Sequence, residues 1–470
     1  MNKYWKIIIT SCLIWVTPFT TLSTAQEESS HRLSIDNAVR LAVKHNPDLE
    51  SARLDVKRSD ARVLEAWGYA MPSVDVSGQY AHFIDKPVTF FPDVFLYGFM
   101  KAIDSTIPKP TGKLVPVSFT PSFTASASVT VKQLLFNGAV IVGVGAAHVY
   151  SQLAGDLYQS KQVEIVTKVR KAYYSALLAD EALNLMRSSL KNAEDNLKNV
   201  QLMRSQGIIS EYDELRASVG VENVRPLVIQ SETNYILALD VLRNTIGISS
   251  SAGIILTDSL SFLAVDDTLS ARADELLPEL NPSISAVRRQ IDLNQAAISA
   301  ERSNYLPTIA AFGSYQYQSS MNNFNFSTND FYKSSMVGLS ISLNVFQGLQ
   351  TFARVQQAQV DKRKSEEQLN SLEKNLRTAL HSIAGNLRQT RKRIEAQEKT
   401  VEMAEKGYKI VTTRFVNNAA TQLEVNDAQL ALTQSKVNRI QAIFDYLNAS
   451  ADLDQLLGRL PSSALETTEN

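Results

Sequence analysis

The chain has 470 residues, of which 47 are Lys or Arg and 48 are Asp or Glu, so its formal net charge is −1. A balanced charge gives no electrostatic reason to bind nucleic acid, and no nucleic-acid partner is expected. The single Cys excludes disulfide frameworks, Cys-based zinc sites and CxxC redox motifs. The 18 Gly and 14 Pro together lie well below the average share of roughly 12%, which favours long helices.

The first 25 residues have the pattern of a secretory signal peptide. Lys3 and Lys6 precede an apolar segment, and a small residue, Ala25, precedes the expected cleavage point. Cys12 lies where a lipoprotein cleavage box is also conceivable, so lipidation of Cys12 is the alternative to its removal with residues 1–25. No later run of 18 apolar residues occurs, which excludes a bundle of membrane-spanning helices.

The rest of the chain repeats itself with one insertion. Early motif pairs share an offset of 235 residues, and later pairs share an offset of 210 or 211. The early pairs are His45-Asn46-Pro47 with Leu280-Asn281-Pro282, Ala70-Met71-Pro72 with Tyr305-Leu306-Pro307, and Gly78-Gln79-Tyr80 with Gly313-Ser314-Tyr315. Such a colinear series predicts two structural repeats, at 26–247 and 272–458. A linker at 248–271 joins them, and a polar tail follows at 459–470.

Each repeat is expected to run in the order helix, strand, loop, strand, very long helix, tight turn and return helix. The first repeat places the strands near 72–136, the long helix at 139–206 and the return helix at 211–247. The second repeat places the same elements near 307–346, at 349–416 and at 420–458.

Proline positions mark the insertion and one irregularity. Six of the 14 prolines lie between Pro87 and Pro121, where the extra residues of the first repeat fall. Because proline disrupts helices and sheet ladders, this stretch is predicted to be a loop. A shorter loop is expected at 322–330. Pro226 should kink the 211–247 helix or end it early.

The long helices carry a heptad pattern. In the first helix, apolar or small residues recur every seven positions in two companion series: Ile165, Ala172, Ala179, Met186, Ala193 and Val200, with Val169, Ala176, Leu183, Leu190 and Leu197. The second helix repeats the interval at Leu380, Leu387, Ile394, Val401 and Tyr408. At 1.5 Å per residue each helix is roughly 100 Å long, which predicts an extended barrel or bundle. A plain coiled-coil rod remains the alternative.

The segments before these helices alternate with a period of two, as half-buried strands do. Between 123 and 132, apolar residues alternate with hydroxyl-bearing residues and a lysine, and 337–345 has a similar pattern. A sheet on a soluble core is the usual meaning of this pattern. Strands of 9–11 residues with apolar and hydroxyl-rich faces also suit an outer-membrane barrel with a watery lumen.

Four strands are too few to close such a barrel, because the smallest barrels have about eight. A sheet in lipid must have no open edge, so several chains would have to pool their strands. The residues alone therefore predict an oligomer, and three chains would supply twelve strands.

The ordered set of motifs resembles the outer-membrane efflux protein family, the TolC-like channels. The resemblance covers nearly the whole chain after the signal peptide. It rests on the two-fold repeat, the Asn-Pro openings and the closing Leu-Leu-Gly at 456–458. It rests as well on the strand ends Leu135-Phe136-Asn137-Gly138 and Val345-Phe346-Gln347-Gly348.

The resemblance implies a mainly α-helical fold with a small β-barrel portion. In it, a homotrimer forms a 12-stranded outer-membrane β-barrel that continues into a long α-helical periplasmic barrel. The implied function is the outer-membrane channel component of a tripartite efflux or secretion system in a Gram-negative bacterium. The implied partners are outer-membrane lipid, a periplasmic adaptor (membrane fusion) protein and an inner-membrane RND or ABC pump.

The resemblance also implies where the duct is gated. Glu424 and Asp427 fall where the family has an acidic constriction ring, and they share one helical face. Glu214 is the counterpart of Glu424 at an offset of 210. In a trimer such carboxylates would crowd together, raise each other's pKa and favour a cation.

The two helix–turn–helix junctions are the expected periplasmic tips. The candidate tip and adaptor contacts are Gly207, Ile208, Ile209, Asn417, Asn418, Arg414 and Tyr408. Gly and Asn tolerate the left-handed backbone that ends a helix. Tyr408 and Arg414 lie near the family's gate-linking side chains, with one more residue between them than the family pattern has.

No catalytic constellation is found in the sequence. The five His residues are scattered, no HExxH or P-loop occurs, and Gly143-Val144-Gly145 lacks the third glycine of a nucleotide loop. The protein is therefore not expected to be an enzyme or to hold a cofactor or metal. The alternative function is an elongated periplasmic coiled-coil structural protein that is anchored to the outer membrane without conducting.

Overall fold

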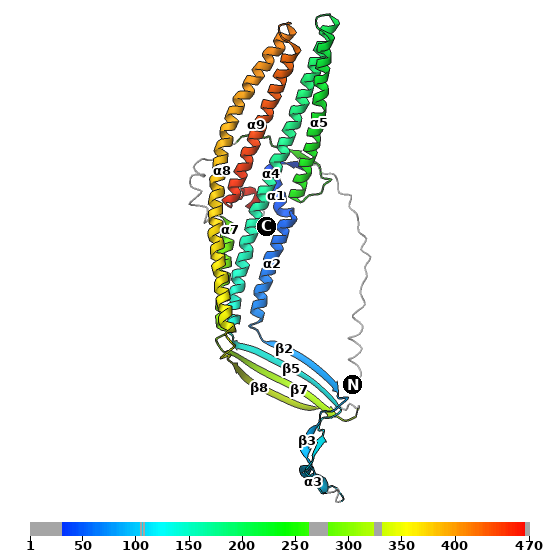
Figure 1. Cartoon of the computed structure of the whole chain (residues 1–470), viewed down its shortest axis with the longest axis vertical. Coiled ribbons are helices and arrows are strands. Elements are labelled where there is room, and N and C mark those ends of the chain that lie inside the picture. Colours follow the sequence, from blue (N-terminus) through cyan, green and yellow to red (C-terminus); the bar gives the residue numbers. More distant parts are fainter. Residues whose placement is uncertain (1–30, 104–105, 107–108, 263–280, 324–330, 466–470) are drawn as a thin grey trace.

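The computed structural model describes residues 31–103, 106, 109–262, 281–323 and 331–465. The expected signal peptide, including Cys12, lies outside these ranges. So do parts of the expected linker, of the shorter loop and of the tail. The chain is elongated, with two helical hairpins at one end, a curved sheet at the other, and a small ribbon beyond the sheet (Figure 1).

Four antiparallel strands form the main sheet: β2 (Ser73–His82), β5 (Phe123–Phe136), β7 (Thr308–Met321) and β8 (Tyr332–Ser342). Their order is β2-β5-β7-β8, so the two repeats join between β5 and β7. The two central strands have 14 residues each, which exceeds the expected 9–11. Strand β8 stops at Ser342, so Leu343 and Val345 lie beyond the strand in which the alternation placed them.

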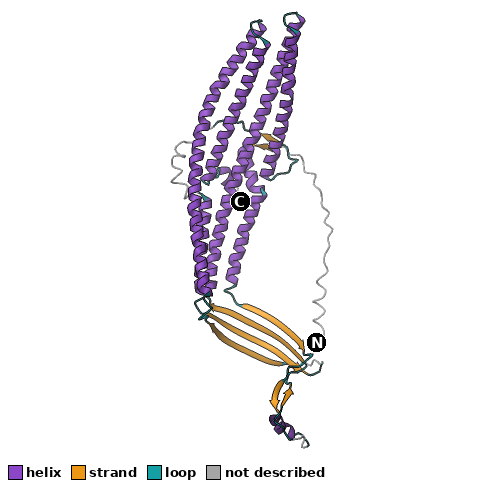
Figure 2. Cartoon of the chain, in the orientation of Figure 1, coloured by secondary structure: helices purple, strands orange, loops and turns teal. Residues whose placement is uncertain are grey.

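Helices make up the rest of the length (Figure 2). They are α1 (Ile35–His45), α2 (Pro47–Gly68), α4 (Gly138–Ser205), α5 (Glu211–Ile246), α7 (Pro282–Ser303), α8 (Gln350–Val416), α9 (Gln422–Leu456) and the short α10 (Ser462–Leu465). Helix α4 packs against α2 and α7 near the sheet and against α5 and α9 toward the hairpin tips (Figure 1). One continuous helix therefore connects the sheet end of the chain with the hairpin tips.

The heptad series of α4 and α8 is the packing seam of these helices. Every member of the series is buried or half-buried, and Val169, Ala176 and Ile394 are almost completely buried. A regular seven-residue seam keeps the same face toward the neighbouring helix over many turns. This packing explains how α4 extends over 68 residues and α8 over 67.

In each repeat, an asparagine halfway along the molecule connects the start of one helix to the end of another. Asn46 caps α2 by accepting from the Leu49 N–H at 3.1 Å, and its Nδ2 donates to the Thr245 carbonyl at 2.8 Å, at the end of α5. Asn281 caps α7 in the same way and donates to the Leu456 carbonyl at 2.7 Å, at the end of α9. The repeated Asn-Pro motif is thus a helix start that also satisfies a distant helix end.

Gly247 is required where the end of α5 meets the start of α2. It ends α5 with a left-handed φ of 83°, and a Cβ there would overlap the carbonyl oxygen of His45. The short strands β1 (His31–Leu33) and β6 (Ile254–Leu256) pair in parallel nearby. The close backbone approach explains the glycine that closes the first repeat.

The proline-rich insertion has more structure than a loop. Strands β3 (Thr89–Pro92) and β4 (Leu114–Val117) pair as an antiparallel ribbon that carries helix α3 (Asp93–Lys101). The prediction of a plain loop was wrong because a two-stranded ribbon consists only of edge strands. Pro92 and Pro116 fit at such edges, where a missing N–H removes no ladder bond.

Helix α5 also continues past Pro226. It runs without interruption from Glu211 to Ile246, so of the two expected effects of Pro226, a kink or an early end, the early end does not occur. Pro226 is exposed, and water can satisfy the carbonyl that loses its partner. The packing of α5 along α4 sustains the helix beyond the proline.

The asparagine contacts predict a matched loss of stability. Replacing Asn46 or Asn281 by Ala removes a cap and leaves a carbonyl unpaired, so each change should lower the free energy of unfolding by about 2 kcal/mol. Far-UV circular dichroism of thermal unfolding in detergent measures this loss. Asn199→Ala, at an exposed position within α4, is the control and should leave the midpoint nearly unchanged. Equal midpoints for N46A, N281A and N199A would contradict the structural role.

Candidate functional site

The main sheet has one apolar face and one polar face. The register places Val76, Val129 and Tyr315 in one row, and Ser77, Ser128 and Gln316 in the adjacent row on the other face. The apolar face is open, because Val76 is 77% exposed and Val337 is 88% exposed. Exposed aliphatic side chains in such a continuous array are typical of a surface that contacts lipid.

The polar face is hydroxyl-rich and also carries charge. Asp75 and Lys132 belong to it, so the face is not made of hydroxyl-bearing residues alone. Hydrogen bonds link it across the strands, for example between Ser77 Oγ and Ser128 Oγ at 2.8 Å. Such a surface suits a water-filled lumen.

Aromatic side chains mark the end of the apolar face farthest from the helices. At the outer ends of β2 and β5, the Phe123 ring stacks on His82 at 4.3 Å and on Tyr80 at 6.2 Å. Aromatic rings prefer the interface between acyl chains and headgroups. The order along the strands, aliphatic and then aromatic, is therefore that of a membrane band with its outer boundary.

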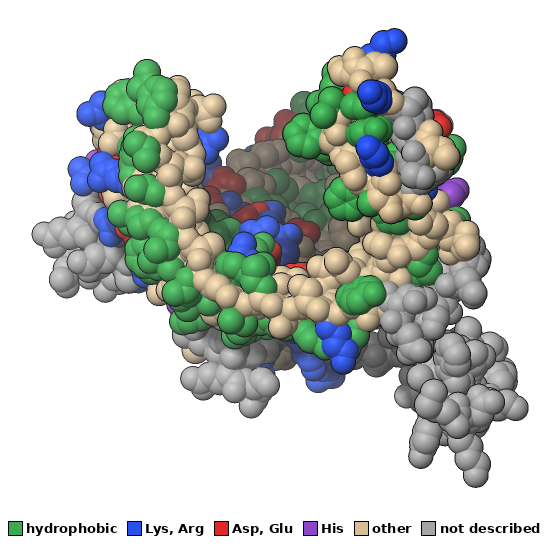
Figure 3. All heavy atoms as spheres, turned by 90° about the horizontal axis from the view of Figure 1, so that it is seen from below, with side chains coloured by type: hydrophobic (Ala, Val, Ile, Leu, Met, Phe, Trp, Pro, Cys, Tyr) green, Lys and Arg blue, Asp and Glu red, His purple; other side chains and the backbone are tan. Residues whose placement is uncertain are grey.

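The edges of the sheet are open. Strands β2 and β8 each have one neighbour among the described residues. Viewed from the sheet end, the chain curves around a hollow, with charged side chains in its depth (Figure 3). A single chain therefore forms part of a wall and does not enclose a channel.

The first tip turn connects α4 to α5. Gly207 has a left-handed φ of 72°, and its N–H donates to the Arg204 carbonyl at 2.8 Å. Ser210 then caps α5 in a capping box with Asp213. Ile208 is exposed at the end of the turn, whereas Ile209 packs against the apolar cluster below it.

The second tip turn connects α8 to α9 with the same backbone course. Asn418 takes the left-handed φ of 57°, and its N–H donates to the Phe415 carbonyl at 2.9 Å. Asn417 is exposed and donates to the Thr413 carbonyl at 2.8 Å. Thr421 caps α9 in a capping box with Glu424.

These turns correct the alignment of the two repeats. Gly207 matches Asn418, Ser210 matches Thr421 and Asp213 matches Glu424, all at an offset of 211. Glu214, which sequence comparison paired with Glu424 at 210, lies one position further along its helix. Matching single letters placed the glutamates together, whereas hydrogen-bond geometry pairs Glu424 with Asp213. The pattern Ser/Thr-x-x-Asp/Glu was the signal that could have shown this.

Glu424 is held by its own turn. Its Oε2 accepts from the Thr421 N–H at 2.6 Å and from Thr421 Oγ1 at 3.1 Å. These hydrogen bonds, with a smaller contribution from the charge of Arg414, hold the pKa of Glu424 below its usual value. The pKa is thus lowered within one chain, whereas crowding in a ring was expected to raise it.

The other candidate residues lie around the two tips and differ in their burial and in their hydrogen-bond or ion-pair partners. Glu214 forms an ion pair with Arg204. Arg414 donates to the Ala419 carbonyl of its own turn at 2.8 Å. Asp427 is exposed one helical turn after Glu424. Tyr408, like Ile209, is partly buried against the apolar cluster, and burial raises the pKa of Tyr408.

An apolar cluster ties the two tips of one chain together. Val200 and Ala217 of the first hairpin cluster with Phe415 and Val425 of the second. The structure therefore brings the two turns to one end of the molecule. It leaves their charged side chains around the cluster, exposed or in ion pairs.

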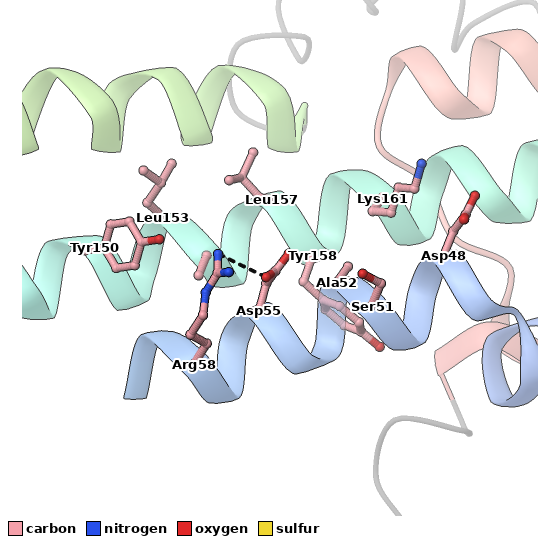
Figure 4. A pocket seen from close by; sticks show the side chains of 11 residues that line it. Asp48, Ser51, Ala52, Asp55, Arg58, Tyr150, Leu153, Leu157, Tyr158 and Lys161 are labelled. Atoms are coloured by element: carbon pink, nitrogen blue, oxygen red, sulfur yellow. Dashed lines mark ion pairs between the residues drawn. The ribbon is translucent and has the colours of Figure 1, made fainter. Parts of the chain in front are cut away.

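A groove of about 430 Å³ lies between α2 and α4 (Figure 4). Its charges balance, and Arg58 pairs with Asp55 at 3.1 Å. Within the described ranges, no group of three or more His, Cys, Asp or Glu residues could hold a metal ion. By length and composition alone, one stretch of helix α4 is apolar enough to cross a membrane, and 11% of that stretch is buried.

The sequence matches a known family over both repeats. Residues 88–248 and 275–459 match the family profile described as outer membrane efflux protein. The chain belongs to the outer membrane efflux protein family. It is a channel protein of the outer membrane of Gram-negative bacteria, and its helices extend into the periplasm.

Several relatives are known from other bacteria. The chain is 23% identical to the outer membrane protein TolC of Vibrio cholerae, over 71% of this chain and 77% of that protein. It is 22% identical to the alkaline protease secretion protein AprF of Pseudomonas aeruginosa, over 67% of this chain and 65% of that protein. It is 25% identical to the cobalt-zinc-cadmium resistance protein CzcC of Cupriavidus metallidurans, over 67% and 73%.

Solved structures share the fold at low sequence identity. The outer membrane protein VceC of Vibrio cholerae has a TM-score of 0.70 and 14% identity, over 90% of this chain and 96% of that chain. The CmeC outer membrane channel of Campylobacter jejuni has a TM-score of 0.71 and 14% identity, over 93% and 88%. The TolC-like fold is thereby confirmed, and the relatives are channel proteins rather than enzymes.

The capping box of α9 predicts a pH dependence at the second tip. Because the pKa of Glu424 is lowered, its carboxylate stabilises the first turn of α9 at neutral pH. This stabilisation is lost as the pH falls through the lowered pKa. Amide hydrogen exchange of that turn, corrected for intrinsic rates, should show protection that falls with acidification.

Two variants separate charge from hydrogen bonding. Glu424→Gln keeps a capping acceptor without titrating, so its protection should not change with pH. Glu424→Ala should lose protection at every pH. A pH profile of E424Q identical to that of the natural chain would exclude the carboxylate as the cause.

Proposed function

We propose that three copies of this chain form a closed 12-stranded barrel in the outer membrane and a continuous α-helical tunnel in the periplasm. The chain then acts as a passive export duct. The observation that carries this proposal is the open four-stranded sheet with one lipid-like face and one lumen-like face.

The direction of the strands supports closure by rotation. In an antiparallel sheet of four strands, the edge strands β2 and β8 run in opposite directions. Strand β8 of one copy can therefore pair antiparallel with β2 of the next, and the same contact can repeat around a ring. Each unpaired backbone group in lipid costs several kcal/mol, which gives the ring its driving force.

The number three follows from the width that a duct needs. Two copies would give eight strands, and side chains fill the interior of a barrel of that size. Three copies give twelve strands and leave an aqueous lumen. The edges of the helical layer, α2 and α8, would close in the same step as the sheet.

We place the gate at the periplasmic tips. Glu424 and Asp427 would form a ring of carboxylates around the axis, with Glu214 and its Arg204 partner beside it. A ring of this kind favours cations and disfavours anions at the constriction. The exposed residues of the turns, with Ile208 at the first and Asn417 and Asn418 at the second, are the proposed contacts of a periplasmic adaptor.

A separate protein must supply the energy, because a duct of this kind only conducts. The proposed partners are the adaptor and an inner-membrane pump of the RND or ABC class. One relative is named for the secretion of a protease, and another for resistance to metal cations. The common element of these systems is the duct, so the proposal assigns no single cargo.

Conductance tests the proposal directly. Purified protein should form ion channels in planar lipid bilayers. Glu424→Ala/Asp427→Ala should raise the open-channel conductance and weaken block by multivalent cations, because the carboxylate ring that binds them is removed.

A matched double variant serves as the control. Glu366→Ala/Glu367→Ala removes the same charge from an exposed part of α8, about 75 Å from the tip along the helix. This variant should conduct like the natural chain. Complete absence of conductance in all forms would favour the non-conducting structural protein. An equal effect of both double variants would contradict the proposal that the gate lies at the tip.

A further inference from the structure

The insertion between β2 and β5 presents an unusual helix. Helix α3 sits at the end of the β3–β4 ribbon and projects beyond the sheet, on the side opposite the long helices (Figure 1). Its outward face is apolar: Val94, Phe95 and Phe99 are exposed, with Phe95 at 75% and Phe99 at 81%. Ile103 continues this face just after the helix. A helix in water normally turns such a face inward.

The ribbon holds α3 in this orientation. Asp93, at the start of the helix, accepts from the Thr111 N–H at 2.6 Å and from the Gly112 N–H at 2.9 Å. The Asp93 N–H donates to the Lys113 carbonyl at 2.9 Å. The Phe91 ring meets Phe119 edge-on at 5.7 Å. The apolar face is thus directed outward by a connected structure.

The charge around this face is basic. The described part of the insertion holds four lysines, Lys86, Lys101, Lys109 and Lys113, against two carboxylates, Asp85 and Asp93, and the carboxylate of Asp93 is occupied by the loop that it holds. The hydrogen bond from the Thr111 N–H, with the other bonds of this loop, holds the pKa of Asp93 low. An aromatic helix face flanked by lysines is typical of segments that lie in a membrane interface.

The apolar face also continues an apolar surface already described. The insertion that carries the ribbon leaves the sheet directly after His82 and returns directly before Phe123. Phe123 stacks on both His82 and Tyr80 at the outer end of the lipid-like face. Ile84 and Val88 are exposed between that aromatic end and α3.

We propose that α3 lies in the headgroup layer of the outer leaflet, as an external membrane anchor of the channel. Its face of Val94, Phe95, Phe99 and Ile103 enters the acyl region, and the neighbouring lysines contact lipid phosphates. This inference rests on the proposed barrel, because the barrel sets the depth at which the ribbon leaves the membrane.

Lipid quenching of a single fluorophore tests the anchor. In a full-length Cys12→Ser background, Phe99→Cys is labelled with an environment-sensitive dye. The labelled protein is reconstituted into phosphatidylcholine vesicles with brominated acyl chains. Its emission should fall by about two-fold or more relative to vesicles without bromine, as expected for a dye at the acyl boundary. Asn323→Cys, two residues past the outer end of β7 and outside the insertion, should change little.

A third label separates this inference from the barrel on which it rests. Val337→Cys reports on the proposed lipid-facing side of the sheet. Quenching at residue 337 without quenching at residue 99 would overturn the anchor and leave the barrel intact. No quenching at residue 337 would overturn the barrel itself.

The same position can exclude a contact between copies. If the α3 helices met over the pore, pyrene at residue 99 would show excimer emission and no quenching by bromine, which would overturn the membrane anchor. The expected result is monomer emission with quenching.

The lysines predict a preference for phosphate-rich lipid. Adding lipid A to the vesicles should increase the quenching at residue 99. Lys101→Gln/Lys113→Gln should abolish this increase while it keeps the quenching in phosphatidylcholine alone. The same increase in both proteins would overturn the role of the lysines.

Discussion

Unpaired backbone groups at the edges of β2 and β8 are the constraint on which the rest of this protein depends. In water such edges can bind solvent, but in a hydrocarbon layer each unsatisfied N–H or C=O costs several kcal/mol. A four-stranded sheet with one aliphatic face is therefore stable in a bilayer only as part of a closed ring. The proposed oligomer and its proposed lumen both follow from this one requirement.

The periplasmic half depends on a different kind of contact. Helices α4 and α8 are far longer than the sheet is wide, and their heptad seams keep them packed along their length. At the middle of the chain, Asn46 and Asn281 each start one helix and satisfy the end of another. Here α4 exchanges its neighbours α2 and α7 for α5 and α9. The exchange is possible because the helix ends are hydrogen-bonded inside the protein.

At the tips, Glu424 has one observed role and one proposed role. Glu424 caps α9 within its own chain, and the proposed ring places the same carboxylate at the constriction. A carboxylate already bound by N–H and O–H donors stays ionised in a crowded ring more readily than a free one. The capping box would therefore help to keep charge at the position of the proposed gate.

The sequence by itself determined the elements and the family, because heptads, period-two alternation and Asn-Pro starts are local patterns. Tertiary structure decided the rest. The contact of Asn46 with Thr245 spans 199 residues, and no local pattern indicates it. The ribbon under α3 and the unbroken helix at Pro226 depend on neighbouring elements that override local preference. The match of Glu424 with Asp213 also required hydrogen-bond geometry, since two repeats can keep one backbone course while their letters shift by one residue.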